Sequence, residues 1–178
     1  MSSDSKCVFV TVGSTKFDAL VAAVLSNDVF ESLKKTGFDR LVIQCGNSKV
    51  PLSPRIWNDE ILLDTPINGI STSIWRFKKS LKDNYAAADL VIGHAGSGTI
   101  IEVLRMGRKL IAVPNETLLH NHQAELAEAL DTSGYLIASP VSDLAEAIQQ
   151  AMSKDFERFP EYDGSKFSRI LDEEMGFI

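Results

Sequence analysis

The sequence predicts an α/β protein built on a doubly wound, mostly parallel sheet of the Rossmann-like kind. Short apolar runs recur along the chain, and their near-continuous apolar character is typical of strands covered by helices on both faces. Amphipathic segments separate these runs, and the alternation of strand and helix indicates βαβ units. The chain has 178 residues, of which 44% are hydrophobic, so it can bury the core of a single domain of ordinary size.

Six apolar runs are expected to form the strands, because each is rich in Val, Ile, Leu and aromatic residues and is bounded by Gly, Pro or Asp. They are residues 7–12, 40–45, 73–77, 89–93, 109–114 and 134–138. Amphipathic segments are expected to form the helices, at 16–36, 80–88, 98–107, 121–133 and 142–153. Most predicted strands are therefore followed by a helix that can return the chain across the sheet.

Two segments depart from this alternation. Residues 46–72 contain three prolines and two glycines and are expected to form a long surface loop with one short extra strand at 60–64. The tail alternates charged and aromatic residues and is expected to end in a helix over 165–175. We therefore divide the chain into a ligand-binding domain, 1–153, and a tail, 154–178. The tail is expected to fold back over its own sheet, to contact a partner, or to do both.

Charge and hydropathy exclude several classes of protein. The formal net charge is -6 and the isoelectric point is about 5.1, without a block of like charges, so neither a nucleic-acid-binding surface nor a polybasic membrane anchor is expected. No apolar run approaches the roughly 18 residues that a spanning helix needs, and the N-terminal MSSDSK is polar where a signal peptide is apolar. We therefore expect a cytoplasmic protein that reaches a membrane only through a partner.

Ligands of an open parallel sheet bind outside the carboxyl ends of the strands, where loops lead into helix N-termini. In the first such loop, the strand over 7–12 ends at Gly13, and Ser14 or Thr15 is expected to cap the following helix. The second loop follows the strand over 89–93 and consists of His94, Ala95, Gly96, Ser97, Gly98 and Thr99. A helix N-terminus carries about half a positive charge and several unpaired N–H donors, so two such ends can hold a diphosphate without a metal.

Better-known phosphate motifs do not fit these loops. Gly93 and Gly98 have the spacing of a P-loop, but Thr99 stands where that motif requires a lysine. A dinucleotide fingerprint needs three glycines after the first strand, where only Gly13 is present. The alternative to a phosphate site is that the glycines only permit a tight turn and close helix packing.

Polar residues for the other parts of a ligand follow on the next two helices. Glu102 lies four residues after Gly98, where its carboxylate can accept two hydrogen bonds from a ribose diol; otherwise it is a solvated helix residue. Asn121, His122 and Gln123 begin a later predicted helix, and their amide and imidazole groups suit sugar hydroxyls.

Neither a metal site nor a cofactor is expected. His94, His120 and His122 lack a carboxylate or cysteine at ligand spacing. Cys7 and Cys45 fall inside predicted strands, so we expect buried, reduced thiols rather than a disulfide or metal ligands.

The stretch VIGHAGSGTIIEVLRMGRKLIAVPNETLLHNHQAELAEAL, with FVTVGST near the N-terminus, resembles a known family. It is similar to the C-terminal, donor-binding domain of the family 28 glycosyltransferases of GT-B fold. Within that family it looks most like the catalytic subunits of two-component UDP-N-acetylglucosamine (UDP-GlcNAc) transferases of the endoplasmic reticulum. The resemblance covers residues 7–153, and its H-A-G-x-G-T…E and N-H-Q-x-E-L-A elements are specific; the tail matches less clearly.

The resemblance implies roles for the residues already singled out. Gly13, Ser14 and Thr15 match the loop that approaches the donor diphosphate, and the loop from His94 to Thr99 matches one near the phosphates and the sugar. Glu102 matches the glutamate that binds the uridine ribose. His122 and Gln123 match polar contacts to the GlcNAc hydroxyls, with Asn121 beside them. The segment 46–72 matches poorly, so no uracil or phosphate contact is assigned there.

The resemblance also implies a partner. In a GT-B enzyme, the N-terminal domain binds the acceptor and usually supplies the catalytic base, whereas this chain begins at the donor half. We therefore expect a heterodimer with a membrane-anchored, acceptor-binding subunit, which recruits this chain to the cytosolic face of the endoplasmic reticulum. The implied reaction is inverting transfer of GlcNAc from UDP-GlcNAc to a lipid-linked GlcNAc, dolichol-diphosphate-GlcNAc. The base is not identified, although His94 is a candidate.

Two other classes of protein share this type of fold. A sugar-nucleotide epimerase needs a second domain of its own, for which 178 residues leave no room. A non-catalytic nucleotide-sugar sensor has the same sequence features as a donor-binding subunit, and only activity with a partner separates the two.

Overall fold

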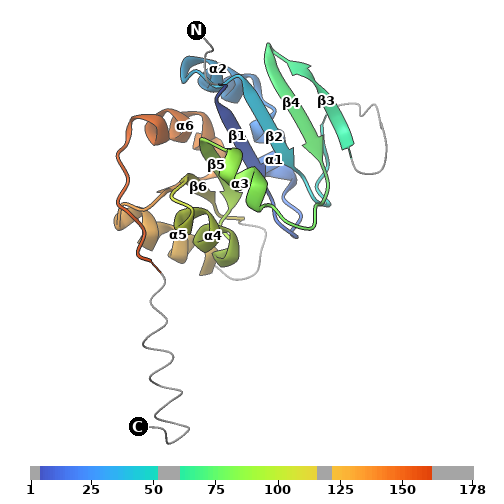
Figure 1. The fold of residues 1–178 in the computed structure, drawn as a ribbon. Coiled ribbons are helices and arrows are strands. Elements are labelled where there is room, and N and C mark those ends of the chain that lie inside the picture. Colours follow the sequence, from blue (N-terminus) through green and yellow to red (C-terminus); the bar gives the residue numbers. More distant parts are fainter. Residues whose placement is uncertain (1–4, 52–60, 116–121, 162–178) are drawn as a thin grey trace, which may run out of the picture.

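The computed structural model describes residues 5–51, 61–115 and 122–161. Figure 1 shows a central twisted sheet with helices packed against it. The strands are β1 (Cys7–Thr11), β2 (Arg40–Gln44), β3 (Ile61–Ile67), β4 (Ile70–Trp75), β5 (Leu90–His94), β6 (Lys109–Val113) and β7 (Ile137–Ala138). The helices are α1 (Asp18–Val24), α2 (Asn27–Lys35), α3 (Lys82–Ala87), α4 (Ser97–Arg105), α5 (His122–Thr132) and α6 (Leu144–Ser153), with a 3-10 turn at Val141–Asp143.

The sheet has the order β3-β4-β2-β1-β5-β6-β7, and all neighbouring strands are parallel except β3 and β4. The chain starts in the middle of the sheet and adds strands first on one side and then on the other. The carboxyl ends of all strands except β3 therefore meet at one edge, which we call the carboxyl edge. The prediction of a doubly wound, mostly parallel sheet is confirmed.

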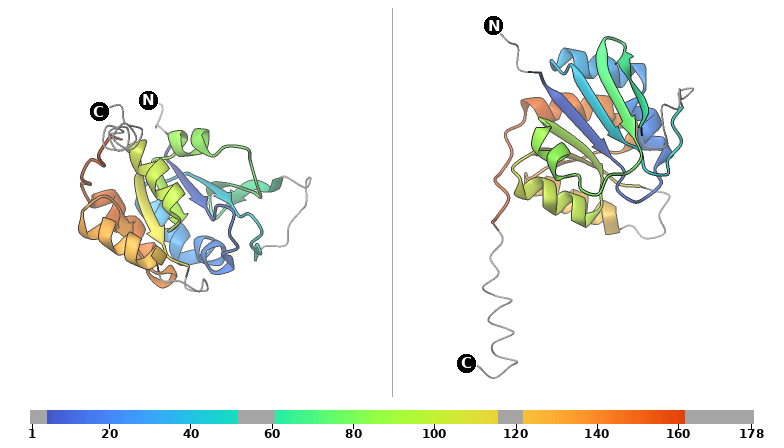
Figure 2. Two further views of the ribbon diagram at one scale, coloured as in Figure 1. Left: turned by 90° about the horizontal axis from the view of Figure 1, so that it is seen from below. Right: turned by 45° about the vertical axis from the view of Figure 1, so that its right-hand side comes forward.

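Helices cover both faces of the sheet, as the further views in Figure 2 show. Within β1 the side chains alternate, so that Val8 and Val10 pack on the face covered by α1, α2 and α6. Phe9 packs on the other face, where α3, α4 and α5 contribute Tyr85, Ile100 and Ala127, respectively. Burial of each large apolar side chain stabilises the fold by roughly 1.5–3 kcal/mol, which explains why the central strands have near-continuous apolar sequences.

The helix predicted over 16–36 is in fact two helices. α1 ends at Val24, and Ser26 adopts an extended conformation in which its hydroxyl accepts a hydrogen bond from the N–H of Val29, at 3.4 Å. Ser26 is therefore the N-cap of α2, which interrupts an otherwise helical pattern.

The long loop predicted over 46–72 is wrong from residue 61 onward, although the short extra strand predicted at 60–64 corresponds to β3. Residues 61–75 instead form an antiparallel hairpin of β3 and β4, whose two-residue turn is Asn68 and Gly69. Both residues have positive φ, 48° and 82°, as the tight turns that match strand twist require. Pro66 is tolerated because β3 is an edge strand, where a missing N–H breaks no ladder inside the sheet.

The structure describes the first part of the tail, 154–161, which packs back on the domain. Phe156 is partly buried against one core, and Phe159 contacts the other core, with its ring centroid 5.2 Å from that of Tyr135. The helix predicted over 165–175 lies outside the described residues.

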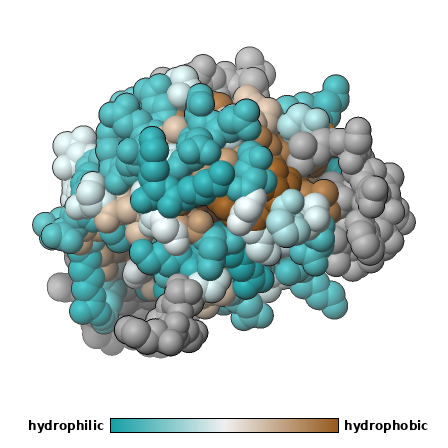
Figure 3. Space-filling view, turned by 90° about the horizontal axis from the view of Figure 1, so that it is seen from above, coloured by the Kyte–Doolittle hydropathy of each residue, from teal (hydrophilic) through white to brown (hydrophobic). Residues whose placement is uncertain are grey.

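Few large apolar side chains are exposed among the described residues, namely Phe77, Ile101 and Met106. Figure 3 shows one face on which hydrophilic side chains surround a narrow apolar strip. Among the described residues, no helix has the length and apolar character needed to cross a membrane. Both cysteines are free and buried, as the sequence predicted, and burial raises the pKa of each thiol.

Candidate functional site

The two glycine loops predicted from the sequence lie side by side at the carboxyl edge. β1 and β5 are neighbouring parallel strands, and Thr11 pairs with Gly93 at their ends. The loop after β1 and the loop after β5 therefore leave the sheet at the same level. This is the position at which open parallel sheets bind ligands.

The imidazole of His94 joins the two loops. A Cβ added to Gly13 would collide with Cε1 of His94, and a Cβ added to Gly96 would collide with its Nε2. Gly13 also has a φ of +61°, which favours glycine. Both glycines are therefore needed to make room for the ring. Gly13 and Gly96 therefore fit the alternative interpretation, in which glycines permit tight turns and close packing.

His94 is almost completely buried, with 8% of its surface exposed. Burial lowers the pKa of its imidazole below the ordinary value of 6.5, and the backbone of Thr11 offsets this only in part. Its Nδ1 atom is buried without a hydrogen-bond partner among the described residues. Burial therefore favours the neutral form of the ring, which lies beneath the loops rather than on their outer surface.

The outer surface of the second loop is the N-terminus of α4. The N-cap is Gly96, which has no side chain to occupy the free N–H groups of the first turn. Ser97 and Gly98 are exposed. No heavy atom of the described residues lies within 4 Å of a Cβ placed on Gly98, so the fold itself does not require a glycine there. An open helix N-terminus of this kind suits an anion such as a phosphate.

Glu102 lies on the same helix, one turn after Gly98, and is partly exposed. Beneath it, Tyr85 of α3 is buried, which raises the pKa of its hydroxyl; the nearby Glu102 carboxylate adds to this increase. The nearby hydroxyls of Thr99 and Thr11 oppose the increase in this pKa. Tyr85 thus connects the start of α4 with the end of β1.

The first loop differs from its prediction. α1 begins only at Asp18, with Phe17 as its N-cap, so neither Ser14 nor Thr15 caps it. The Thr15 hydroxyl instead donates to the carbonyl of Val12, at 2.7 Å, in a turn between strand and helix. The predicted caps of α1 are therefore wrong: a hydrogen-bonded turn separates the end of β1 from the N-terminus of α1, which lies three residues beyond Thr15.

A buried polar network fixes this turn, and sequence reasoning did not identify its members. The Thr11 hydroxyl donates to Oε1 of Gln44, at 2.6 Å, and accepts from the N–H of Gly13, at 3.0 Å. Nε2 of Gln44 donates to the carbonyls of Gly13, at 3.0 Å, and of Arg76, at 2.7 Å. Nη1 of Arg76 in turn donates to the carbonyl of Gly46, at 2.9 Å. The turn is therefore held by side chains at the ends of β1 and β2.

Gln44 and Thr11 were detectable in principle. Each is a polar residue at the end of an otherwise apolar run, and each is fully buried, with 2% and 0% of its surface exposed. A buried polar side chain needs a hydrogen-bond partner, so its presence in a core strand indicates a specific structural task.

The residues predicted for the sugar are only partly described. Asn121 lies outside the described residues. His122 begins α5, with its side chain exposed and 3.7 Å from the Glu125 carboxylate. Oε1 of Gln123 accepts a hydrogen bond from the N–H of Asn115, at 3.4 Å. Nδ2 of Asn115 also donates to the carbonyl of Lys16, at 3.2 Å, so it ties the loop after β6 to the first glycine loop.

A cavity of about 270 Å³ lies beside the first loop, between the start of α1 and the residues after β6 and β7, with Phe17, Asn115 and Val141 in its lining. A larger cavity of about 730 Å³ lies near the amino end of β6, where Lys109 and the segment 154–161 contribute to its lining. It is lined by none of the predicted ligand residues. Within the described part of the chain, no three His, Cys, Asp or Glu residues are placed to hold a metal ion.

Comparisons with known proteins agree with this arrangement. The model of the glycosyltransferase family 28 C-terminal domain matches residues 7–173. The chain belongs to glycosyltransferase family 28. The match covers every residue of the two glycine loops, so the family 28 domain includes the whole candidate site.

Curated relatives of this family 28 domain share a name. It is 42% identical over 131 residues to the UDP-N-acetylglucosamine transferase subunit ALG13 of Homo sapiens, covering 74% of this chain but only 11% of the human protein. It is 33% identical over 193 residues to the ALG13 subunit of Cryptococcus neoformans, covering 96% of both chains. The chain thus spans a small part of the human relative and nearly all of the fungal one.

Solved structures show the same fold. The solution structure of ALG13 superimposes on the family 28 domain with a TM-score of 0.66 at 27% identity, over 94% of this chain and 95% of that one. MurG of Acinetobacter baumannii superimposes with a TM-score of 0.60 at 21% identity, over 86% of this chain and 42% of MurG. At that identity, the likeness to MurG concerns the fold alone.

Proposed function

We propose that this chain is the donor-binding, catalytic subunit of a UDP-GlcNAc transferase. The observation that carries the proposal is the similarity to a fungal UDP-N-acetylglucosamine transferase subunit over 96% of both chains. The geometry supports it, because an open helix N-terminus and a partly exposed carboxylate lie on one helix at the carboxyl edge.

In this proposal, the donor lies along the carboxyl edge. The N–H groups at Ser97, Gly98 and Thr99 bind the diphosphate, and the turn at Gly13, Ser14 and Thr15 approaches it from the other side. Glu102 accepts hydrogen bonds from the uridine ribose. His122 and Gln123, with Asn121 beside them, face the GlcNAc hydroxyls. Backbone donors are preorganised, so they stabilise the negative charge that develops on the departing UDP without a metal ion.

The reaction is inverting transfer, in which an acceptor hydroxyl attacks C1 of the sugar. A general base must reach the proton that it removes. His94 is an unfavourable choice for this role, because it is 8% exposed and its ring is packed beneath Gly13 and Gly96. We assign the base to a partner subunit, which also binds the acceptor.

The partner in this proposal is a membrane-anchored subunit that holds this chain at the cytosolic face of the endoplasmic reticulum. The acceptor is dolichol-diphosphate-GlcNAc, so the product is the chitobiose-linked lipid of the second step in N-glycan precursor assembly. The relatives are named as subunits of a transferase, which supports a multi-subunit enzyme. The tail beyond residue 161 is our candidate for contact with that partner.

Two measurements test the proposal. Calorimetry with UDP and UDP-GlcNAc should detect binding to the purified chain, and transfer to a dolichol-diphosphate-GlcNAc analogue should appear only after membranes carrying the partner are added. Deletion of 165–178 should remove transfer but leave UDP binding intact. Binding without transfer under any condition would identify a nucleotide-sugar sensor instead, and full turnover by the purified chain would refute the need for a partner.

The sugar end of the site has its own test. The change His122→Ala should spare UDP binding and reduce the preference for UDP-GlcNAc over UDP-glucose, because the proposal assigns the GlcNAc hydroxyls to the exposed His122 side chain and the diphosphate and ribose to α4. Equal losses for UDP and UDP-GlcNAc would contradict this division of the site.

A further inference from the structure

The segment after β4, residues 76–82 with the sequence RFKKSLK, has a surface unlike the rest of the molecule. The sequence predicted a strand that continues to residue 77, but β4 ends at Trp75. Phe77 therefore leaves the sheet, and 49% of its surface is exposed. It is the most exposed of the large apolar side chains in the described part of the chain.

Positive charge surrounds Phe77. The segment contains Arg76, Lys78, Lys79 and Lys82 and no acidic residue, although the whole chain has a net charge of -6. The three lysines are exposed. The ammonium of Lys78 lies 4.3 Å from the ring centroid of the buried Trp75, which orients the segment on the domain.

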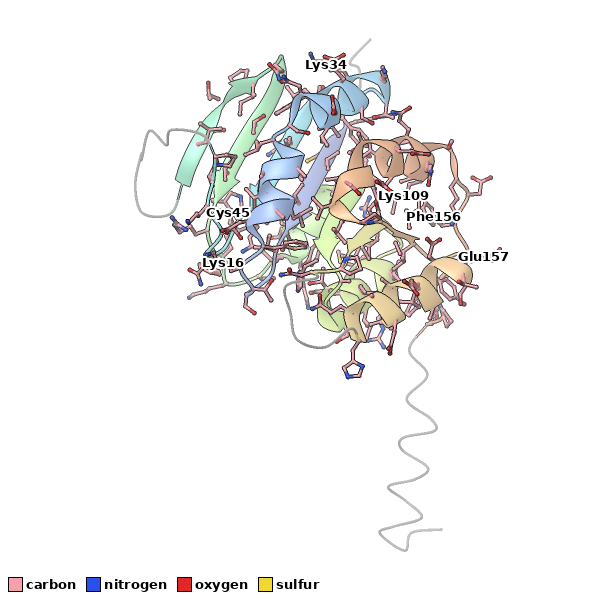
Figure 4. All side chains as sticks on the ribbon, turned by 180° about the vertical axis from the view of Figure 1, so that it is seen from behind. Lys16, Lys34, Cys45, Lys109, Phe156 and Glu157 are labelled. Atoms are coloured by element: carbon pink, nitrogen blue, oxygen red, sulfur yellow. The ribbon has the colours of Figure 1, made fainter. Side chains whose placement is uncertain are left out.

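The segment belongs to the carboxyl edge. Arg76 is the residue whose carbonyl accepts from Gln44 and whose guanidinium donates to Gly46, so the start of the segment is bonded to the network behind Gly13. Lys16, which follows the first loop, is also exposed at this edge, but its ammonium is paired with the Asp18 carboxylate at 3.5 Å, so the free positive charge belongs to residues 76–82. Figure 4 shows Lys16 close to Cys45, whereas Lys34, Lys109 and Phe156 lie in other parts of the molecule.

The sequence alone predicts membrane contact only through a partner; from the exposed Phe77 and its neighbouring lysines, we propose instead that residues 76–82 also dock this domain directly on an anionic lipid surface, with Phe77 inserted at the headgroup level. Aromatic side chains favour that level, and each Lys or Arg near an anionic membrane strengthens binding roughly fivefold. A negatively charged protein surface is the alternative occupant. A lipid surface is favoured because three exposed lysines, Lys78, Lys79 and Lys82, lie in five consecutive residues next to the exposed Phe77, a pattern that needs only a uniformly charged surface.

Docking in this way turns the carboxyl edge toward the membrane. A lipid-linked acceptor would then meet the donor site without a long excursion from the bilayer. The inference goes beyond the proposed function and does not depend on it, because lipid binding is measured without nucleotide, acceptor or partner subunit.

The test is flotation of the purified full chain with phosphatidylcholine vesicles that either contain or lack phosphatidylserine. Binding should need phosphatidylserine and should fall as salt is raised from about 0.1 M to about 1 M, where the Debye length shortens from about 10 Å to about 3 Å. The double change Lys78→Glu and Lys79→Glu should weaken binding at least about 25-fold, and Phe77→Ala should weaken binding at both salt concentrations.

The chain offers a matched control. Lys34 and Lys35 are exposed at the end of α2, and the double change Lys34→Glu and Lys35→Glu alters the net charge by the same amount. This control should bind the anionic vesicles nearly as well as the native chain. Equal losses in the two double variants would mean that only net charge matters, which would overturn the proposal.

Two further outcomes would also overturn it. One is the absence of native-chain binding to phosphatidylserine vesicles. The other is an effect of the Phe77→Ala change only on capture by the membrane-anchored partner, which would identify the segment as a protein contact. If the charge-reversal variant fails to fold by circular dichroism, the salt dependence of the native chain and the Phe77→Ala variant still decide the question. These experiments measure lipid binding and not UDP binding, so they test the further inference separately from the proposed function.

Discussion

The two glycine loops at the carboxyl edge look alike in sequence but are built differently. In the first loop, Gly13 has a positive φ, its Cβ would collide with His94, and Thr11 and Gln44 hold it by side-chain hydrogen bonds. In the second loop, Gly98 faces open space at the start of α4.

This difference separates two reasons for a glycine. At Gly13 the protein itself excludes a side chain, whereas at Gly98 the described residues leave room for one. A glycine that the fold does not require is explained if a ligand must approach the backbone closely. Four experiments test this distinction.

The largest effect is expected for Gly13→Ala. An alanine at a φ of +61° is strained, and its Cβ displaces a buried imidazole, so the free energy of unfolding should fall by about 2–4 kcal/mol. Urea denaturation measures this. Gly37→Ala is the matched control, because Gly37 has a φ of +82° but no described atom within 4 Å of a Cβ. If both changes cost the same, His94 is not the obstacle.

The second effect should appear in ligand binding rather than in stability. Gly98→Val should fold normally but weaken UDP binding at least about a hundredfold, or about 2.7 kcal/mol, because the side chain occupies the space where the diphosphate approaches α4. Calorimetry with UDP measures the affinity, and Gly98→Ala should give a smaller loss. An unchanged affinity in the folded valine variant would place the diphosphate elsewhere.

The third effect concerns the other end of the nucleotide. Glu102→Gln keeps the shape of the side chain but removes the charge, and hydrogen bonds to a charged group contribute about 1.5–3 kcal/mol. UDP affinity should therefore fall about tenfold or more. The native chain should bind 2'-deoxy-UDP more weakly than UDP, and the variant should discriminate less. Glu128→Gln, at an exposed position on α5, is the control and should change neither affinity.

The smallest effect concerns pH. Because the pKa of His94 is lower in the folded chain than its ordinary value of 6.5, the unfolded chain binds more protons as pH falls below that value. The free energy of unfolding should therefore decrease with falling pH, by up to about 1.4 kcal/mol per pH unit from this residue. Denaturation at several pH values should show a shallower slope in His94→Gln than in His122→Gln; equal slopes would assign the pH dependence to other groups.

Much of the fold could be predicted, because the relevant signals are local. The runs over 7–12, 89–93 and 109–114 correspond to β1, β5 and β6 within a residue at each end, because strands buried on both faces have continuously apolar sequences. The hairpin was missed although Asn68 and Gly69 are a strong turn signal, because Pro66 and the other prolines of 46–72 favoured a loop.

The site was harder to predict than the fold. The small residues of both loops were identified, and the structure brings Gly13, His94 and Gly96 together. The parts that could not be predicted depend on contacts between distant segments. Gln44 holds Gly13 across 31 positions of sequence, and no local pattern specifies that pairing. The position of the helix start after Gly13 likewise depends on Ser48, whose hydroxyl accepts from the N–H of Phe17.

The hairpin of β3 and β4 has a consequence for how the molecule avoids self-association. A sheet edge with unpaired backbone groups is a template on which another chain can add a strand. At one edge of this sheet, β3 carries the exposed Asp64 and Pro66, and a proline has no N–H to offer. At the other edge, β7 is only two residues long, Ile137–Ala138. Both ends of a strongly apolar sheet are therefore poor templates for strand addition, which protects the chain from edge-to-edge aggregation at high concentration.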